Sequence, residues 1–439
     1  MRCAYVIILM VFYWSLETLP IAVTALIPML LYPLFEIATA GELAPKYMDE
    51  TNMAFLTSII VIAAFESAGL HKMLALGVLK LIGIQQRWVM FGFMIVSWFL
   101  SMWMQNTMTT ALLVPIVLEV SQELSLAISI KRQESQANLQ RLADRQNNNN
   151  EDIEKQTPHK MADDTPIEKI HRNYKVMLLI AVAYSSSIGG VATLLGTSPN
   201  LMMKQQIDSA YLDKGCTSPL NFLSWMVFSV PASCLFIILA WIWLSCYFCG
   251  FLYTFGCKKS PLDDHKEHVQ RVINQMYKAL PPLGFKQYVV LINVVAMVVL
   301  MLTRLLNNDP IIGWEVIAPG YVKESTAAVL VVLIIFIFPV SVPKENAEGK
   351  WTAPKSILKW PETERAIPTE IVLLIGGGMA AAYGAEASGL ARILSELLDD
   401  LTSSLSDEIA VCVITIFIVF VTEVMSNTAC VVLMMPILR

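Results

Sequence analysis

Long apolar segments run through almost the whole chain, and they constrain its fold more than any other feature. Twelve such segments lie at residues 3–18, 19–35, 53–83, 87–104, 107–120, 175–195, 221–254, 288–306, 325–340, 368–395, 409–425 and 427–438. About 20 apolar residues cross a bilayer as a helix, because a backbone in lipid must satisfy its own hydrogen bonds. Of the 439 residues, 56% are hydrophobic and 15% are charged. The sequence therefore predicts an all-α polytopic membrane protein in a lipid bilayer.

Several other classes of protein do not fit the composition. The net charge of −5 does not suggest a nucleic-acid partner. Cys246 and Cys249 form a C-x-x-C pair, but it lies in an aromatic membrane run without a second pair. No nucleophile–base pair or histidine metal cluster is visible, so an enzyme is not predicted. The first apolar run has no small-residue cleavage site after it and is interpreted as a retained span.

Three polar, basic stretches separate groups of apolar segments and orient the chain. They lie at residues 121–174, 257–287 and 341–368. The first contains the low-complexity run RQNNNNEDIEKQ and is predicted to be a disordered loop. Two long spans separate each stretch from the next, so all three stretches lie on one side of the membrane. Because Lys and Arg accumulate on the cytoplasmic side, that side is predicted to be the cytoplasm.

A polar interruption occurs within the apolar run Leu100–Ile116, at Gln105-Asn106-Thr107, here called the first tip. The arm after it, Met108–Val120, would reach only about 20 Å as a helix, less than the roughly 30 Å hydrocarbon core. The first arm begins at a short basic turn at Arg87, and the second arm ends at the first basic stretch. The sequence therefore predicts a re-entrant hairpin that enters from the cytoplasm and has the first tip at its end.

A second interruption, Ser426-Asn427-Thr428 (the second tip), matches the first and reveals an internal repeat. In both halves a proline follows the tip threonine by eight residues, and ESAGL at Glu66–Leu70 matches EASGL at Glu386–Leu390. An odd number of full spans separates the two hairpins, so the second is expected to enter from outside. Inverted repeats with broken helices are the architecture of secondary transporters, with the binding site at the breaks.

Each tip offers amides and hydroxyls beside helix ends. The N-terminus of the following half-helix favours an anion, and the carbonyls that end the preceding one favour a cation such as Na⁺. A third interruption, Gly196-Thr197-Ser198-Pro199-Asn200 (the central interruption), is predicted to unwind, with Gly189 and Gly190 loosening the helix before it.

Other polar or small residues in the apolar segments are interpreted mainly as structural. The run Gly376-Gly377-Gly378 is interpreted as a close-packing or hinge element, since no phosphate-loop Lys-Ser/Thr follows it. The acids in or beside apolar segments are Glu17, Glu66, Glu386 and Glu423. Such acids are functional candidates, but Glu66 and Glu386 recur with the repeat, which favours a structural hydrogen bond over a proton-carrying role.

The motifs LHKMLAL, SMWMQNTMTTALLVPI, GTSPN and SNTACVVLMMPI resemble the divalent-anion/sodium symporter family, the sodium-coupled di- and tricarboxylate and sulfate cotransporters. The resemblance covers nearly the whole chain outside the polar loops. It implies a homodimer whose protomers each contain a scaffold domain and an elevator-like transport domain. It also implies that the two tips and the central interruption form the binding site.

The resemblance, together with the central interruption, gives a set of candidate site residues. The expected sodium ligands are Gln105, Asn106 and Gly196 at one site and Ser426 and Asn427 at the other. The expected substrate-binding residues are Asn106, Thr107, Thr197, Ser198, Pro199, Asn200, Asn427 and Thr428.

The chain departs from the family pattern in three places. Gln105 stands where the family usually has serine, so its longer amide crowds the first sodium site. The chain is expected to start one span late and to stop before the partner of the central interruption. It therefore matches the family as a chain shortened at both ends, with an incomplete second sodium site.

The predicted function is sodium-coupled symport of di- or tricarboxylates such as succinate and citrate, small dianions, by a multi-pass plasma-membrane protein. The co-transported ion is Na⁺. A sulfate carrier and a non-transporting fragment that pairs with full-length subunits are the alternatives. The predicted divisions are scaffold helices (1–85), the cytoplasm-side hairpin (86–120), the disordered loop (121–174), transport-domain helices (175–256), a cytoplasmic linker (257–287), second-repeat scaffold helices (288–400) and the outside-facing hairpin (401–439).

Overall fold

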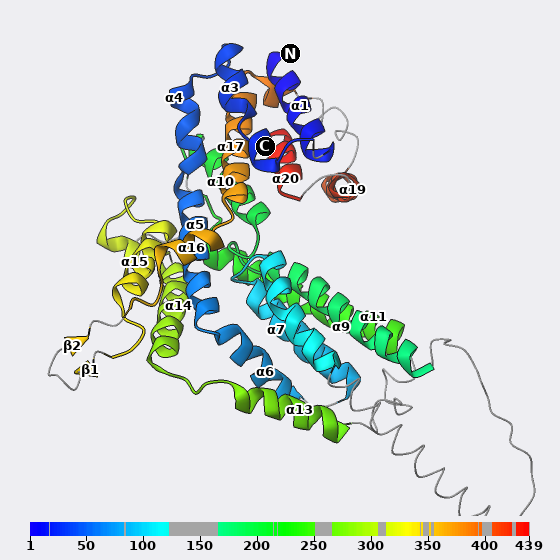
Figure 1. Ribbon diagram of the computed structural model, residues 1–439. Coiled ribbons are helices and arrows are strands. Elements are labelled where there is room, and N and C mark those ends of the chain that lie inside the picture. Colours follow the sequence, from blue (N-terminus) through cyan, green and yellow to red (C-terminus); the bar gives the residue numbers. More distant parts are fainter. Residues whose placement is uncertain are drawn as a thin grey trace, which may run out of the picture. The chain divides into compact units, whose positions relative to one another are not determined.

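The computed structural model is nearly all helical and falls into two compact units (Figure 1). It describes residues 1–16, 18–82, 85–122, 166–213, 215–216, 218–250, 266–305, 313–342, 344–345, 351–352, 355–393, 395–396, 406–423 and 427–438. The first unit comprises Met1–Ala68, Val191–Val230 and Leu283–Arg439, and the second comprises Gly69–Gly190 and Pro231–Pro282.

The first unit contains most of the described elements. Its helices are α1 (Arg2–Leu16), α2 (Ile21–Thr24), α3 (Ile27–Leu34), α4 (Ala40–Leu43), η1 (Ala44–Met48), α5 (Glu50–Ser67), α10 (Ser198–Asp213), α14 (Phe285–Thr303), η3 (Trp314–Ile317), α15 (Glu324–Ile337), α16 (Trp360–Ala366), α17 (Thr369–Ala387), α19 (Asp407–Thr422) and α20 (Asn427–Leu438). Two short antiparallel strands, β1 (Lys344–Glu345) and β2 (Trp351–Thr352), pair with Lys344 opposite Thr352.

The second unit contains α6 (Leu70–Ile82), α7 (Gln86–Ser101), a helix over residues 106–122 and α13 (Lys266–Ala279). It also includes most of α9 (Pro166–Val191), and α11 (Phe222–Cys249) from Pro231 onward. Within this unit α6 packs against α7 and α13. Trp88 stacks on Trp241, with ring centroids 5.4 Å apart, which joins α7 to α11.

Five described helical stretches are long and apolar enough to cross a membrane. They are Ala40–Ser67, Arg172–Val191, Phe222–Phe248, Phe285–Thr303 and Thr369–Ala387. Shorter apolar helices lie at Arg2–Leu16, Ile21–Leu34, Glu324–Ile337 and Glu408–Thr422. The prediction of a helical polytopic membrane protein is confirmed at this level.

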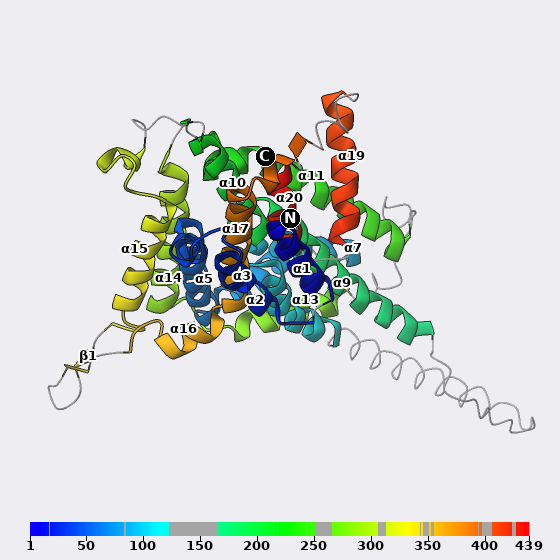
Figure 2. The same ribbon diagram turned by 90° about the horizontal axis from the view of Figure 1, so that it is seen from above.

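Two helix bundles form the core of the first unit (Figures 1 and 2). Around α5 lie α14 and α15, and around α17 lie α3, α10 and α20. In the most apolar stretch of α17, 67% of the residues are buried, whereas in that of α14 only 28% are buried. Thus α17 is an interior helix, while α14 presents apolar side chains outward, as a lipid-facing helix does.

The glycines of α17 allow neighbouring elements to approach its backbone. A Cβ on Gly376 would overlap Tyr47, one on Gly377 would overlap the backbone of Ala25, and one on Gly384 would overlap the Tyr32 ring. Tyr47 also donates a hydrogen bond of 2.7 Å to the Ala25 carbonyl. The close-packing interpretation of this glycine run is confirmed.

The internal repeat is visible in the backbone at its two matching motifs. Helix α5 ends before Gly69, whose φ is +70°, and α17 ends before Gly389, whose φ is +72°. A new helix begins at Leu70 in one case and at Leu390 in the other. Glycine adopts this left-handed conformation without steric cost, and it ends both helices in the same way.

Two predicted polar loops contain helices. Helix α9 begins at Pro166, inside the range 121–174 predicted to be a disordered loop, and residues 123–165 lie outside the described residues. Helix α13 occupies part of the predicted linker 257–287. Its residues Ile273 and Tyr277 lie one helical turn apart. The helix packs on α6, where the Lys80 ammonium lies 4.8 Å from the Tyr277 ring centre. An amphipathic helix of this kind needs a partner surface, which the charge pattern alone did not reveal.

Candidate transport site

The first tip lies between two helices of the second unit. Helix α7 ends at Ser101, and the next helix begins at Asn106, so the chain breaks over four residues. The Ser101 hydroxyl donates to Asn106 Oδ1 at 2.7 Å, and the Thr109 N–H donates to the Gln105 carbonyl at 2.9 Å. Gln105 and Asn106 are half-buried and Thr107 is exposed.

The C-terminal part of α9 supports this first tip. Thr110 and Ser186 share a hydroxyl hydrogen bond of 2.8 Å, and Thr110 also donates to the Asn106 carbonyl at 2.8 Å. A Cβ on Gly190 would overlap the Asn106 side chain, and one on Gly189 would overlap the Trp98 backbone.

The expectation that Gly189 and Gly190 loosen the helix was wrong. Helix α9 continues through both glycines to Val191. Their missing side chains instead let α9 approach α7 and the first tip closely. Sequence alone does not separate these roles, because a glycine in a helix is compatible with either flexibility or close contact.

The central interruption is unwound, but earlier than predicted. Residues 192–197 are non-helical, whereas Ser198, Pro199 and Asn200 form the first turn of α10. Proline is tolerated in the first turn of a helix because the N–H that it lacks has no intrahelical partner there. Pro199 therefore lies in the first turn of a helix. The prediction that residues 196–200 are all unwound was wrong for residues 198–200.

Thr193 and Asn200 close the unwound segment 192–197. The Asn200 amide donates to the Thr193 carbonyl at 2.8 Å, and the Gly196 N–H donates to Thr193 Oγ1 at 3.2 Å. Asn200 is buried. Its amide group thus supports the loop, which leaves the half-buried Thr197 as the more accessible polar side chain of the central interruption.

The second tip joins the central interruption within the first unit. Helix α20 begins at Asn427 and packs against α10 and α17. Ser198 and Thr428 share a hydroxyl hydrogen bond of 2.9 Å across 230 residues of sequence. Thr428 is buried and Asn427 is exposed, whereas Ser426 lies outside the described residues.

All three predicted interruptions therefore stand where a helix begins. Asn106, Ser198 and Asn427 are the first helical residues of their helices. Free N–H groups and the positive end of the helix dipole occur at such positions, and they favour a bound anion. The structure brings Ser198 and Thr428 together in the first unit and Asn106 beside Gly190 in the second.

Of the four acids singled out from the sequence, the structure describes three. Glu386 and Glu423 are exposed, Glu66 is half-buried, and Glu17 lies outside the described residues. Neither the structural nor the proton-carrying role is tested by these positions.

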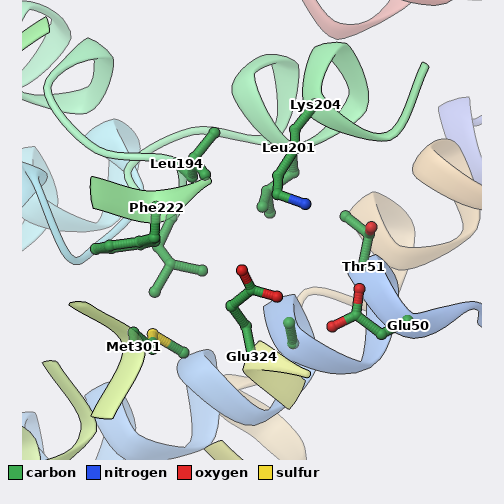
Figure 3. A pocket seen from close by; sticks show the side chains of 10 residues that line it. Glu50, Thr51, Leu194, Leu201, Lys204, Phe222, Met301 and Glu324 are labelled. Atoms are coloured by element: carbon green, nitrogen blue, oxygen red, sulfur yellow. The ribbon is translucent and has the colours of Figure 1, made fainter. Parts of the chain in front are cut away.

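A charge cluster that sequence reasoning missed lies in the first unit. Its members are Glu50, Lys204, Asp208, Arg304, Glu315 and Glu324. Arg304 bridges Glu315 and Glu324 at 2.8 and 2.9 Å. All of them except Glu315 line a cleft of about 660 Å³, together with Lys323. Figure 3 shows Glu50, Lys204 and Glu324 around a smaller cavity beside it. The sequence did contain a signal for this cluster. Lys204, Arg304 and Glu324 are charged residues within or at the ends of apolar or half-apolar helices.

The chain matches the family model described as citrate transporter over residues 7–439. It is 35% identical over 464 residues to Na(+)/dicarboxylate cotransporter 3 of Mus musculus, covering 100% of this chain and 76% of that protein. It is 35% identical over 455 residues to the Na(+)/citrate cotransporter of Rattus norvegicus, covering 99% and 77%. Solute carrier family 13 member 1 of Mus musculus is 30% identical over 476 residues, covering 100% and 78%.

Proposed function

Because the chain belongs to the citrate transporter family, we propose that it is a sodium-coupled symporter of di- or tricarboxylates such as succinate and citrate. Na⁺ is the co-transported ion, and the substrate is a small dianion or trianion. The relatives whose names include a substrate are Na⁺/dicarboxylate and Na⁺/citrate cotransporters, which supports this choice. The proposed activity is transport, with no chemical conversion of the substrate.

The Ser198–Thr428 hydrogen bond is the observation that carries the proposal. It places two helix N-termini, those of α10 and α20, side by side at residues that the sequence had singled out independently. Two converging N-termini with hydroxyl groups provide donors and positive partial charge for a carboxylate without any fixed cation. An anion held in this way can also be released, as transport requires.

The proposed ligands follow the three interruptions. The residues proposed to bind substrate are Asn106, Thr107, Thr197, Ser198, Pro199, Asn200, Asn427 and Thr428. The residues proposed to bind sodium are Gln105, Asn106 and Gly196 in one site and Ser426 and Asn427 in the other. Amide, hydroxyl and carbonyl oxygens are suitable ligands for a hard monovalent cation. Gln105 brings a longer side chain to its site than serine would.

The proposed membrane arrangement has two re-entrant hairpins. Helix α7 has 16 residues, fewer than the roughly 20 that cross a hydrocarbon core, and the helix over 106–122 is also short. The proposed divisions are scaffold segments at 1–85 and 288–400, hairpins at 86–120 and 401–439, and transport-domain helices at 175–256. An elevator movement, a homodimer and a plasma-membrane location complete the proposal.

Uptake of labelled succinate, citrate and sulfate into proteoliposomes tests the function directly. We expect succinate or citrate uptake that requires an inward sodium gradient and disappears when potassium replaces sodium. Uptake that is independent of sodium would contradict symport, and uptake of sulfate alone would assign the other substrate class.

Replacement of Asn427 tests the role of the second tip. Asn427→Ala is expected to abolish sodium-dependent uptake, because it removes an amide from both a sodium site and the substrate site. Asn293→Ala is the matched control, since the Asn293 amide bonds the Val289 carbonyl within its own helix. Normal kinetics in Asn427→Ala would remove the second tip from the mechanism.

A further inference from the structure

Lys204 is a buried cation on the helix that carries the central interruption. It lies in α10, six positions after Ser198, and only 9% of its surface is exposed. A buried ammonium group is costly unless carboxylates surround it. Its presence in the interior of the first unit therefore requires a physical explanation.

Three carboxylates, one each from α5, α10 and α15, explain why the cation is tolerated there. Asp208, one turn further along α10, lies 2.5 Å from the Lys204 ammonium. Glu50 in the first turn of α5 and Glu324 in the first turn of α15 line the same small cavity as Lys204. In Figure 3 the polar ends of Lys204, Glu50 and Glu324 point toward one another across it. The cavity holds about 20 Å³, room for a single water molecule.

The two acids opposite Lys204 are fixed in place. Arg304 holds Glu324 at 2.9 Å and Glu315 at 2.8 Å. Glu50 Oε1 accepts a hydrogen bond of 3.3 Å from the Ser325 N–H, which ties the start of α5 to the start of α15. Glu50 and Glu324 are therefore held in position on the side of the cavity opposite Lys204.

We infer that Lys204 is a positioning residue: its ammonium holds α10 against the first turns of α5 and α15 and thereby keeps Ser198 beside Thr428. Without the Lys204 ammonium, the four carboxylates of the charge cluster have Arg304 as their one cation within the cluster. The attraction that holds α10 against α5 and α15 is then weaker. The link to transport rests on the proposed function, whereas the link to the position of Ser198 does not.

Cross-linking measures that position without measuring transport. In the full chain, Ser198→Cys combined with Thr428→Cys is expected to form a disulfide, because the two native hydroxyls lie 2.9 Å apart. Each single cysteine variant controls for pairing with native cysteines such as Cys430. The rate of disulfide formation under mild oxidation then reports how often α10 holds Ser198 next to Thr428.

Four changes in this cysteine background test the lysine. Lys204→Met is expected to lower the rate about tenfold or more, because it removes the cation that Asp208, Glu50 and Glu324 share. Lys204→Arg, which keeps the charge, should retain most of the rate. Lys204→Met with Glu50→Gln should recover part of it by removing one repelling charge. Lys323→Met is the matched control, because Lys323 lines the same cleft but is exposed, and its rate should not change.

The outcomes separate positioning from other roles. An unchanged rate in Lys204→Met overturns the inference, as does an equal loss in Lys204→Arg, which would indicate packing and not charge. If Lys204→Met does not accumulate, recovery of folded protein by the added Glu50→Gln supports the inference, and failure to recover overturns it.

Uptake by the variants without the engineered cysteines provides the second readout. Positioning predicts that Lys204→Met raises the KM for the dicarboxylate and that Lys204→Arg largely restores it. A raised KM with an unchanged cross-linking rate would make Lys204 a direct ligand of the anion and would overturn the positioning role. If no variant transports, the proposed function fails, while the cross-linking rates still decide the inference.

Discussion

The two tips perform the same proposed task with different support. Asn106 in the first tip is held at 2.7 Å by Ser101, the last residue of α7 and five positions earlier in the chain. Thr428 in the second tip is held at 2.9 Å by Ser198, which lies 230 residues away in sequence. The first tip is thus supported largely by the end of α7 and by α9, whereas the second depends on where α10 lies. A rearrangement of α10 would alter the second tip directly.

Gly189→Ala should break the support of the first tip most severely. The new methyl group would overlap the Trp98 backbone, which cannot move aside as a side chain can. We expect a loss of about 1–3 kcal/mol of stability, typical of an overpacked interior. Yield and thermal unfolding in detergent measure it. Gly77→Ala is the control, since its nearest neighbour would be the Tyr277 ring at an ordinary 3.9 Å.

Gly190→Ala should displace the first tip while the protein still folds. Its methyl group would meet the Asn106 side chain, which can rotate away at the cost of its bond to Ser101. Sodium-dependent uptake is expected to fall about tenfold, equivalent to roughly 1.4 kcal/mol. Uptake at the parental level, with normal yield, would show that the position of Asn106 is not needed for transport.

Ser101→Ala and Ser198→Ala compare the two tips directly. Each removes one neutral hydrogen bond of about 1 kcal/mol, a change of roughly fivefold. Ser101→Ala is expected to raise the sodium concentration for half-maximal uptake, and Ser198→Ala the KM for the dicarboxylate. Ser121→Ala, which removes a hydroxyl bonded to the Val117 carbonyl of its own helix, controls for loss of a buried serine. Equal effects on both parameters would remove the distinction between the tips.

Thr428→Ser should have the smallest effect. It keeps the hydroxyl that pairs with Ser198 and removes only a methyl group, so the KM should change by less than about twofold. Thr428→Val keeps the shape and removes the hydroxyl, and it should reproduce the loss in Ser198→Ala. Kinetics of both variants in the same proteoliposome assay provide the measurement. A larger loss in Thr428→Ser than in Thr428→Val would assign the methyl group the greater role.

Patterns within one helix or one turn were predictable from the sequence. Gly69 and Gly389 occupy matching positions of the predicted repeat, and both adopt the same left-handed conformation at a helix end. A helix is predicted to follow each tip, and Asn106 and Asn427 each begin a helix. These features depend on local backbone preferences, which a single sequence carries.

Features that depend on distant partners were missed or misplaced. The role of Lys204 becomes clear only when α5 and α15 bring Glu50 and Glu324 to it. Pro199 was expected to unwind the chain but begins α10, because its effect depends on which turn of the helix it occupies. In both cases the residue type was informative, but its consequence depended on the place of the residue in the folded chain.

The glycines of α17 have a consequence for movement within the first unit. Gly376 accommodates Tyr47, Gly377 the Ala25 backbone and Gly384 the Tyr32 ring. Because interiors are close-packed, α17 cannot slide by a fraction of a turn without driving a side chain into one of these neighbours. Any conformational change of this unit must therefore carry α17 together with α2, α3 and η1 as one rigid body.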